Sequence, residues 1–176
     1  MINLVPNFLE QDVIDSITKK FEDSRGKAAF EVNDMGRWGK GLEAGSYAPV
    51  FILPLDEYKD FFKKKYAEQV HPMFGNYENL TCFLHIWPKG SQINWHHDDD
   101  EKDPIPRLSS TIYINPSWNW NWGGFFIYDD KDEGQKWIFP HYNLMTWFVP
   151  PIWHSTSMVT LLAEQPRLSI QLFFSR

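Results

Sequence analysis

Residues 94–100, with the sequence NWHHDDD, hold the side chains best suited to bind a metal ion in this chain. Residues two positions apart in an extended strand point to the same side. A histidine therefore shares a strand face with an aspartate in two alternative pairs, His96 with Asp98 or His97 with Asp99. A second histidine from a distant strand would complete a set of two histidines and one carboxylate. That set leaves coordination positions open and is typical of Fe(II) sites that carry out oxidative chemistry.

Two residues far downstream fit such a site. His154 follows a Pro-Pro-Ile-Trp stretch, and Arg167 opens the apolar segment 167–174. A buried arginine is costly without an anion, so Arg167 predicts a carboxylate ligand held by the guanidinium fork. Ser169 lies on the same strand face and could donate a second hydrogen bond. The competing interpretation is a hydrophilic strand end for the histidines and an exposed strand end for the arginine.

The composition is that of a globular protein of about one domain. Of the 176 residues, 43% are hydrophobic, which is enough for a sizeable core and excludes a disordered chain. Aromatic residues make up 17%, including 9 Trp, and 12 Pro and 10 Gly are spread along the chain. This pattern favours many short strands joined by turns.

Charge and cysteine content exclude several classes of protein. A formal net charge of -6 argues against nucleic acid as the main partner, because phosphate backbones favour basic surfaces. The single cysteine, Cys82, excludes an internal disulfide and a cysteine zinc site, and its apolar surroundings predict a core position. Since no apolar run approaches 18 residues and no leader pattern opens the chain, we expect a cytoplasmic protein without a membrane partner.

Helical spacing of apolar residues predicts two helices in the first 80 residues. The first is expected to begin near Asn7 as its N-cap and to end at 24–26, and the second to span 55–70. Residues 28–34 could form a strand between the two helices. The glycine-punctuated stretch 35–50 that follows is either a surface loop or a mobile lid. The residues of this stretch that could reach a substrate are Arg37, Trp38 and Lys40.

From residue 80 onward, short apolar runs alternate with turn residues. The predicted strands are 81–87, 92–98, 108–115, 124–128, 136–139, 144–149, 152–159 and 167–174. Such a series indicates a sandwich, a barrel or a double-sheet jelly roll, with the preceding helices covering one outer face. We therefore expect a mainly β single domain over 1–176, with helical support and a lid in 1–80 and a jelly-roll core in 81–176.

The order of these motifs resembles the Fe(II)/2-oxoglutarate-dependent dioxygenases, most closely their prolyl 4-hydroxylase branch. The shared pattern begins with a Trp-His-x-Asp form at 95–98 and a Tyr-x-Asn form at 113–115. It continues with Trp118, the pair Gly123 and Gly124, His154, and an Arg-x-Ser form at 167–169. The resemblance covers roughly residues 80–176, whereas the preceding residues match only in being helical.

This resemblance implies a double-stranded β-helix whose metal ligands are His96, Asp98 and His154. It also implies Fe(II) as the metal, 2-oxoglutarate as cosubstrate and O2 as oxidant, with ascorbate as a supporting reductant and succinate and CO2 as co-products. The residues expected to bind the distal carboxylate of 2-oxoglutarate are Arg167, Ser169 and Tyr113.

Two features depart from the family pattern. Trp87 stands where many relatives carry an early-strand tyrosine, and this changes the shape of the expected cosubstrate pocket. The interval from His154 to Arg167 is a few residues longer than in many relatives, and a longer turn near 161–165 would absorb it. Neither departure removes a metal ligand.

The substrate is the least constrained feature. Trp118, Trp120 and Trp122 alternate with asparagines, so an extended segment would place them on one side. They either pack within a β-turn region or form an aromatic wall at the site entrance. The resemblance implies a prolyl residue of a protein or peptide as substrate. The alternatives are a small molecule or another amino-acid residue, a non-catalytic jelly-roll binding module, and a nucleic-acid dealkylase.

Overall fold

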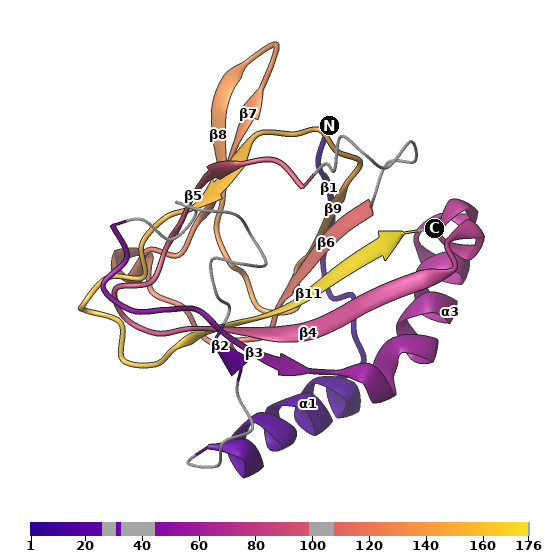
Figure 1. Cartoon of the computed structure of the whole chain (residues 1–176), viewed down its shortest axis with the longest axis horizontal. Helices are drawn as coiled ribbons and strands as arrows, with labels where there is room; N and C mark the ends of the chain where they lie inside the picture. Colours follow the sequence, from indigo (N-terminus) through magenta and orange to yellow (C-terminus); the bar gives the residue numbers. More distant parts are fainter. Residues whose placement is uncertain (26–30, 33–44, 99–107, 176) are drawn as a thin grey trace.

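The computed structural model of the chain describes residues 1–25, 31–32, 45–98 and 108–175 (Figure 1). Its helices are α1 (Gln11–Ser24) and α3 (Lys59–Gln69), with short 3-10 turns η1 (Asp56–Tyr58), η2 (Pro72–Asn76) and η3 (Trp120–Trp122). Its strands are β1 (Asn3–Val5), β2 (Glu31–Val32), β3 (Phe51–Pro54), β4 (Asn79–Trp87), β5 (Ile93–His96), β6 (Leu108–Tyr113), β7 (Phe126–Asp130), β8 (Gly134–Ile138), β9 (Met145–Phe148), β10 (His154–Thr156) and β11 (Arg167–Ser175).

The strands form two antiparallel sheets, as the predicted jelly roll requires (Figure 1). The 7-stranded sheet has the order β1-β9-β6-β11-β4-β3-β2, and the 4-stranded sheet has the order β5-β10-β7-β8. Each of the strands predicted beyond residue 80 overlaps a strand of the structure, so the mainly β prediction is confirmed. Among the described residues, no helix combines the length and the apolar character needed to cross a bilayer.

The N-terminal region contributes more strands than the one predicted at 28–34, whose described part is β2. β1 pairs with β9 and β3 pairs with β4, so this region extends the larger sheet on both sides. The predicted start of the first helix is also wrong, because α1 begins at Gln11 with Glu10 in the N-cap position. Asn7 has a positive φ of 52°, a left-handed conformation that suits a turn before the helix rather than a cap.

The larger sheet buries its two faces against different partners. One face packs on the helices, where Leu84, Ile86, Leu168 and Ile170 join residues of α1 and α3 in the main core (Figure 1). Because side chains alternate along a strand, the residues between them on β4 and β11 point to the opposite face, toward the smaller sheet. This inner face is polar: its buried residues include His85, Arg167 and Ser169.

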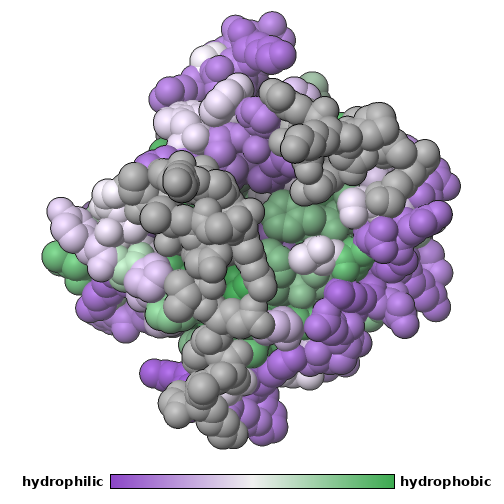
Figure 2. Space-filling view, viewed as in Figure 1, coloured by the Kyte–Doolittle hydropathy of each residue, from purple (hydrophilic) through white to green (hydrophobic). Residues whose placement is uncertain are grey.

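The surface of the molecule has separate apolar and hydrophilic regions. In Figure 2, apolar side chains come to the surface in the middle of this view, whereas the tip of the β7–β8 hairpin and the side of the molecule that carries α3 are hydrophilic. The candidate site lies in the space between the two sheets, which the polar inner face of the larger sheet lines.

Candidate metal centre and anion pocket

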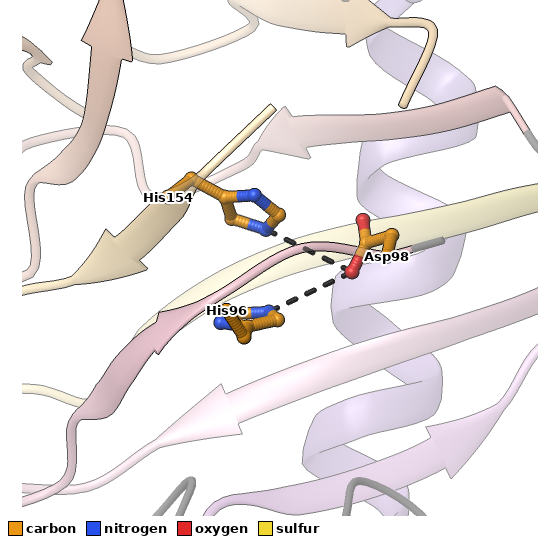
Figure 3. Close-up of side chains that lie close together, drawn as sticks. All are labelled: His96, Asp98 and His154. Carbon is orange, nitrogen blue, oxygen red and sulfur yellow. Dashed lines mark ion pairs between the residues drawn. The ribbon is translucent and has the colours of Figure 1, made fainter. Parts of the chain in front are cut away.

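Three side chains carried by β5, the residues after it and β10 of the smaller sheet converge on one point. His96, Asp98 and His154 each offer a ligand atom, and these atoms all lie within 4.8 Å of one another. Nε2 of His96 lies 3.6 Å from Oδ1 of Asp98, and Nε2 of His154 lies 3.8 Å from the same oxygen (Figure 3). The pairing of β5 with β10 explains the arrangement, because His96 and His154 stand directly opposite each other across the two strands.

Each histidine ring is held by a backbone carbonyl two residues earlier. Nδ1 of His96 lies 2.8 Å from the carbonyl oxygen of Asn94, and Nδ1 of His154 lies 2.8 Å from that of Ile152. A proton on Nδ1 that is donated to a carbonyl leaves Nε2 as the ligand atom, which is how metal-binding histidines are oriented. Burial lowers the pKa of His96, and the neighbouring His154 lowers it further, which favours the neutral form that a metal needs.

The remaining contacts of the cluster fix its other two members. Ser109 on β6 donates a hydrogen bond of 2.5 Å to Oδ2 of Asp98, leaving Oδ1 directed at the histidines. The ring of His154 stacks on Phe126, with centroids 5.1 Å apart, and meets Phe148 edge-on at 5.2 Å. The cluster is therefore built on strands and locked by packing, as a preorganised metal site requires.

The histidine one position along the chain does not join this cluster. The ring of His97 packs edge-on against Trp153, with centroids 4.9 Å apart. Of the two alternative pairs in the sequence, the structure thus brings His96 and Asp98 to the inner face. Asp99 lies outside the described residues.

A second polar group lies on the inner face of the larger sheet, around Arg167 on β11. This residue is 2% exposed, and no ion pair joins it to any acidic residue in the described part of the chain. Its guanidinium lies between two aromatic rings, 5.0 Å from the centroid of Trp87 and 4.9 Å from that of Tyr113. Burial lowers the pKa of Arg167 from its very high usual value, yet a guanidinium stays charged. A buried charge of this kind indicates a site for an anion.

Further hydrogen-bond donors lie close to Arg167. Nη1 of Arg167 donates to Ser169 at 3.3 Å, while its buried Nε and the buried hydroxyl of Tyr113 have no hydrogen-bond partner among the described residues. Burial raises the pKa of Tyr113, so its hydroxyl remains a donor at neutral pH. The register explains the grouping, since Ser169 stands opposite Tyr113 on β6.

A glycine makes room for the arginine. Gly124 has a positive φ of 68°, and a Cβ at this position would lie 2.7 Å from Cδ of Arg167. Any side chain at this position would displace the stem of the Arg167 side chain. Arg167 fits here because residue 124 is a glycine and has no side chain.

A family profile for the 2OG-Fe(II) oxygenase superfamily matches residues 82–175 of the chain. The chain belongs to this superfamily. The match spans the metal cluster and the anion pocket, and it confirms the family predicted from the motifs. A comparison with curated proteins found no match.

Solved structures of this superfamily share the fold. A prolyl-4-hydroxylase from Pseudomonas putida has a TM-score of 0.75 at 16% identity, covering 99% of this chain and 92% of that one. A prolyl hydroxylase from Trichoplax adhaerens, in complex with a hypoxia inducible factor peptide fragment, has a TM-score of 0.77 at 17% identity, covering 99% and 83%. The viral collagen prolyl hydroxylase of Paramecium bursaria Chlorella virus-1 has a TM-score of 0.63 at 14% identity, covering 99% and 96%. The fold is thus the double-stranded β-helix.

The residues present fit the groups that the superfamily name implies. Two imidazoles and one carboxylate provide the ligand set of a non-haem Fe(II) site. The buried guanidinium, with a tyrosine and a serine hydroxyl beside it, matches a carboxylate such as the distal one of 2-oxoglutarate.

Of the two interpretations of Trp118, Trp120 and Trp122, the structure matches packing in a turn region and not an aromatic wall built on an extended segment. The segment turns at η3 instead of running extended, so the three rings do not share one side. Trp118 and Trp122 meet edge-on at 5.1 Å and pack against the core cluster that includes Trp87. Trp120 is 56% exposed and packs on Phe139. The other predicted substrate residues, Arg37 and Trp38, lie outside the described part of the chain, as does Lys40.

Sequence reasoning missed several residues that support the site. Ser109 begins a polar alternation with Thr111 and Tyr113 along β6, and this period of two was a usable signal for an inner face. The carbonyl groups of Asn94 and Ile152 left no signal, because any residue offers a carbonyl. Trp87 was noted only as a departure from the family pattern, but its ring covers Arg167.

Proposed function

We propose that the chain is an Fe(II)- and 2-oxoglutarate-dependent dioxygenase that hydroxylates a C–H bond of its substrate. The observation that carries this proposal is the combination, between the two sheets, of a His/Asp/His cluster with a buried guanidinium that no described acidic residue neutralises. 2-Oxoglutarate has a keto acid end for the metal and a distal carboxylate for the cation. One small molecule therefore satisfies both halves of the site.

The protein residues would divide the work as follows. His96, Asp98 and His154 hold the metal, and Arg167 with Tyr113 and Ser169 orients the distal carboxylate. When bound, ferrous iron with O2 and 2-oxoglutarate supplies the oxidising chemistry that converts R–H to R–OH with release of succinate and CO2. The buried inner face excludes water from this chemistry. Ascorbate is expected to support turnover by keeping the iron reduced.

A prolyl residue of a protein or peptide is the substrate we propose. The solved structures described above include prolyl hydroxylases, one of them holding a peptide fragment, and this likeness supports the proposal. Phe173 stands opposite Ser109, which contacts Asp98, and its ring lies 6.1 Å from that of Phe83. Both rings are half-buried, so an apolar surface lies beside the metal cluster and suits an uncharged ring such as proline.

We also propose that residues 1–176 act as one domain, in which 81–176 provide the chemistry and 1–80 provide support and a lid. Its support is the sharing of one sheet: β3 of the first part pairs with β4 of the second. A cytoplasmic location stays a prediction from the sequence.

Release of labelled CO2 tests the proposed reaction. Protein with Fe(II) and 2-oxoglutarate labelled at its first carbon should release CO2 slowly without substrate and faster with a proline-containing peptide. Asp98→Ala should abolish the release by losing iron, and Arg167→Ala should abolish it while retaining iron. Equal release by wild type and Asp98→Ala would contradict the proposal and leave a non-catalytic binding module as the better account.

The hydroxylated residue can be found separately. The His154→Ala variant is used to co-purify candidate proteins, and these are then treated with wild type and mapped for added oxygen by mass spectrometry. Oxygen on a prolyl ring supports the proposed substrate, whereas oxygen on another residue, or turnover of a small molecule alone, replaces it.

A further inference from the structure

The hydroxyl of Ser169 receives two hydrogen bonds from groups that can only donate. The indole Nε1 of Trp87 donates to Ser169 Oγ at 3.2 Å, and Nη1 of Arg167 donates to the same oxygen at 3.3 Å. A serine hydroxyl has two lone pairs and one hydrogen, while an indole N–H and a guanidinium have no lone pair to offer. Both acceptor positions of Ser169 are therefore used.

The hydrogen of this hydroxyl must then point away from both donors. Ser169 is 1% exposed, so bulk solvent does not reach its hydroxyl, and no described residue accepts a hydrogen bond from its side chain. Ser169 stands between His85 on β4 and Tyr113 on β6. The buried hydroxyl of Tyr113 and the buried Nε of Arg167 beside it also have no hydrogen-bond partner among the described residues, so an anion bound next to them would accept this hydrogen as well.

The indole is held firmly enough to impose this direction. Trp87 is 3% exposed and belongs to a packed cluster with Val50, Ile93, Val159 and Ala163. It also stands directly opposite Arg167 in the strand register. A rigid donor at a fixed position costs little entropy when it orients its partner.

We infer that Trp87 is a positioning residue, which fixes the Ser169 hydroxyl as a donor to the distal carboxylate of the bound keto acid. This inference rests on the proposed function and adds a residue to it: Trp87 acts through Ser169 and through the face of Arg167, without itself being a metal ligand. Without the indole N–H, one acceptor position of Ser169 becomes free, and the hydroxyl can turn its hydrogen away from the anion.

The test compares two keto acids that differ only at the distal end. Their dissociation constants are measured by calorimetry without oxygen on the Fe(II)-loaded protein. 2-Oxoglutarate carries the distal carboxylate, and 2-oxopentanoate has a methyl group in its place. Trp87→Phe keeps the aromatic ring and removes the N–H. It should weaken 2-oxoglutarate binding about threefold to tenfold and leave 2-oxopentanoate binding unchanged, as expected for one lost neutral hydrogen bond.

A double-mutant cycle separates orientation from packing. If Trp87 acts through Ser169, the variant with both Trp87→Phe and Ser169→Ala should bind 2-oxoglutarate as Ser169→Ala does, because no hydroxyl is left to orient. Trp137→Phe is the matched control: this tryptophan is 56% exposed on β8, and its replacement should leave both constants unchanged. Melting temperatures check that each variant is folded.

Each other outcome overturns the inference in a recognisable way. Equal losses for both keto acids in Trp87→Phe, or additive losses in the double variant, would assign Trp87 to packing alone. No loss at all would remove its role while wild type still prefers 2-oxoglutarate, and the proposed function would stand. A wild type without that preference would overturn the anion site and the inference together.

Discussion

At the scale of single residues, the site depends on hydrogen bonds that restrict the rotation of its ligand side chains. Each histidine of the cluster is held by a carbonyl, and Asp98 is held through one oxygen by Ser109. Such contacts raise metal affinity because the ligands are already oriented before the ion arrives. The sequence predicted the three ligand residues, but the contacts that orient them depend on strand pairing and could not be predicted from spacing.

Ser109→Ala tests this orientation. Removing the hydroxyl leaves Asp98 free to rotate, and Fe(II) affinity should fall about tenfold, at the lower end of the effect of such supporting residues. Equilibrium dialysis without oxygen measures the loss. Ser110→Ala is the matched control, because Ser110 bonds Tyr66 and the carbonyl oxygen of Thr146 instead. That variant should lower stability and keep iron affinity, and a similar loss of iron from both would contradict the role of Ser109.

At the scale of elements, the turn before β7 decides whether Arg167 fits. Gly123 and Gly124 both have a φ of 68°, which L side chains rarely adopt. A Cβ on Gly123 would lie 2.1 Å from the carbonyl oxygen of Met158, and one on Gly124 would meet Arg167. The sequence marked this pair as a turn and a family motif, but the contact with an arginine more than forty residues away follows only from the fold.

Gly124→Ala should therefore weaken 2-oxoglutarate binding about tenfold, because the added methyl group pushes the guanidinium out of place, and strain should cost about 1–2 kcal/mol of stability. Gly134→Ala separates the two effects. Gly134 has a φ of 79° with nothing within 4 Å of its Cβ position, so that variant should lose stability without losing affinity. Titration calorimetry and thermal melting measure both quantities, and equal affinities in the two variants would contradict the steric role of Gly124.

The elements themselves were predicted unevenly for a physical reason. The strands after residue 80 show alternation and turn residues, and each was found. β1 has three residues and β3 has four, and neither lies in the regular series of apolar runs and turn residues that revealed the equally short β5, β9 and β10. The start of α1 was misplaced because Asn7 has the composition of a cap but the φ of a turn. The local sequence thus predicted the strands that carry a local pattern, and it missed the elements that lack one.

At the scale of the whole molecule, the two sheets bury ionisable groups between them. His85 is 3% exposed on the inner face, and burial lowers its pKa from 6.5 to about 3, with the charge of Arg167 adding to the effect. Below pH 6.5 an unfolded chain protonates this histidine and the folded chain does not. His85 therefore makes the folded state lose stability as the pH falls from about 6.5 toward about 3.

His85→Gln should remove this dependence. Between about pH 5.5 and pH 4 the free energy of unfolding of wild type should fall more steeply than that of the variant, by up to about 1.4 kcal/mol per pH unit. Urea denaturation of the metal-free proteins at several pH values measures the difference. Parallel pH dependences would show that His85 takes up its proton in the folded state as readily as in the unfolded one.

The pairing of β5 with β10 brings the metal ligands together, and Fe(II) binding by two neighbouring variants tests that arrangement most directly. His96→Ala should weaken binding more than about a hundredfold, because it removes a ligand, whereas His97→Ala should stay within about threefold of wild type. The measurement is equilibrium dialysis of the two variants and wild type without oxygen. Equal binding by His96→Ala and wild type, or a greater loss in His97→Ala, would contradict a metal centre formed by His96, Asp98 and His154.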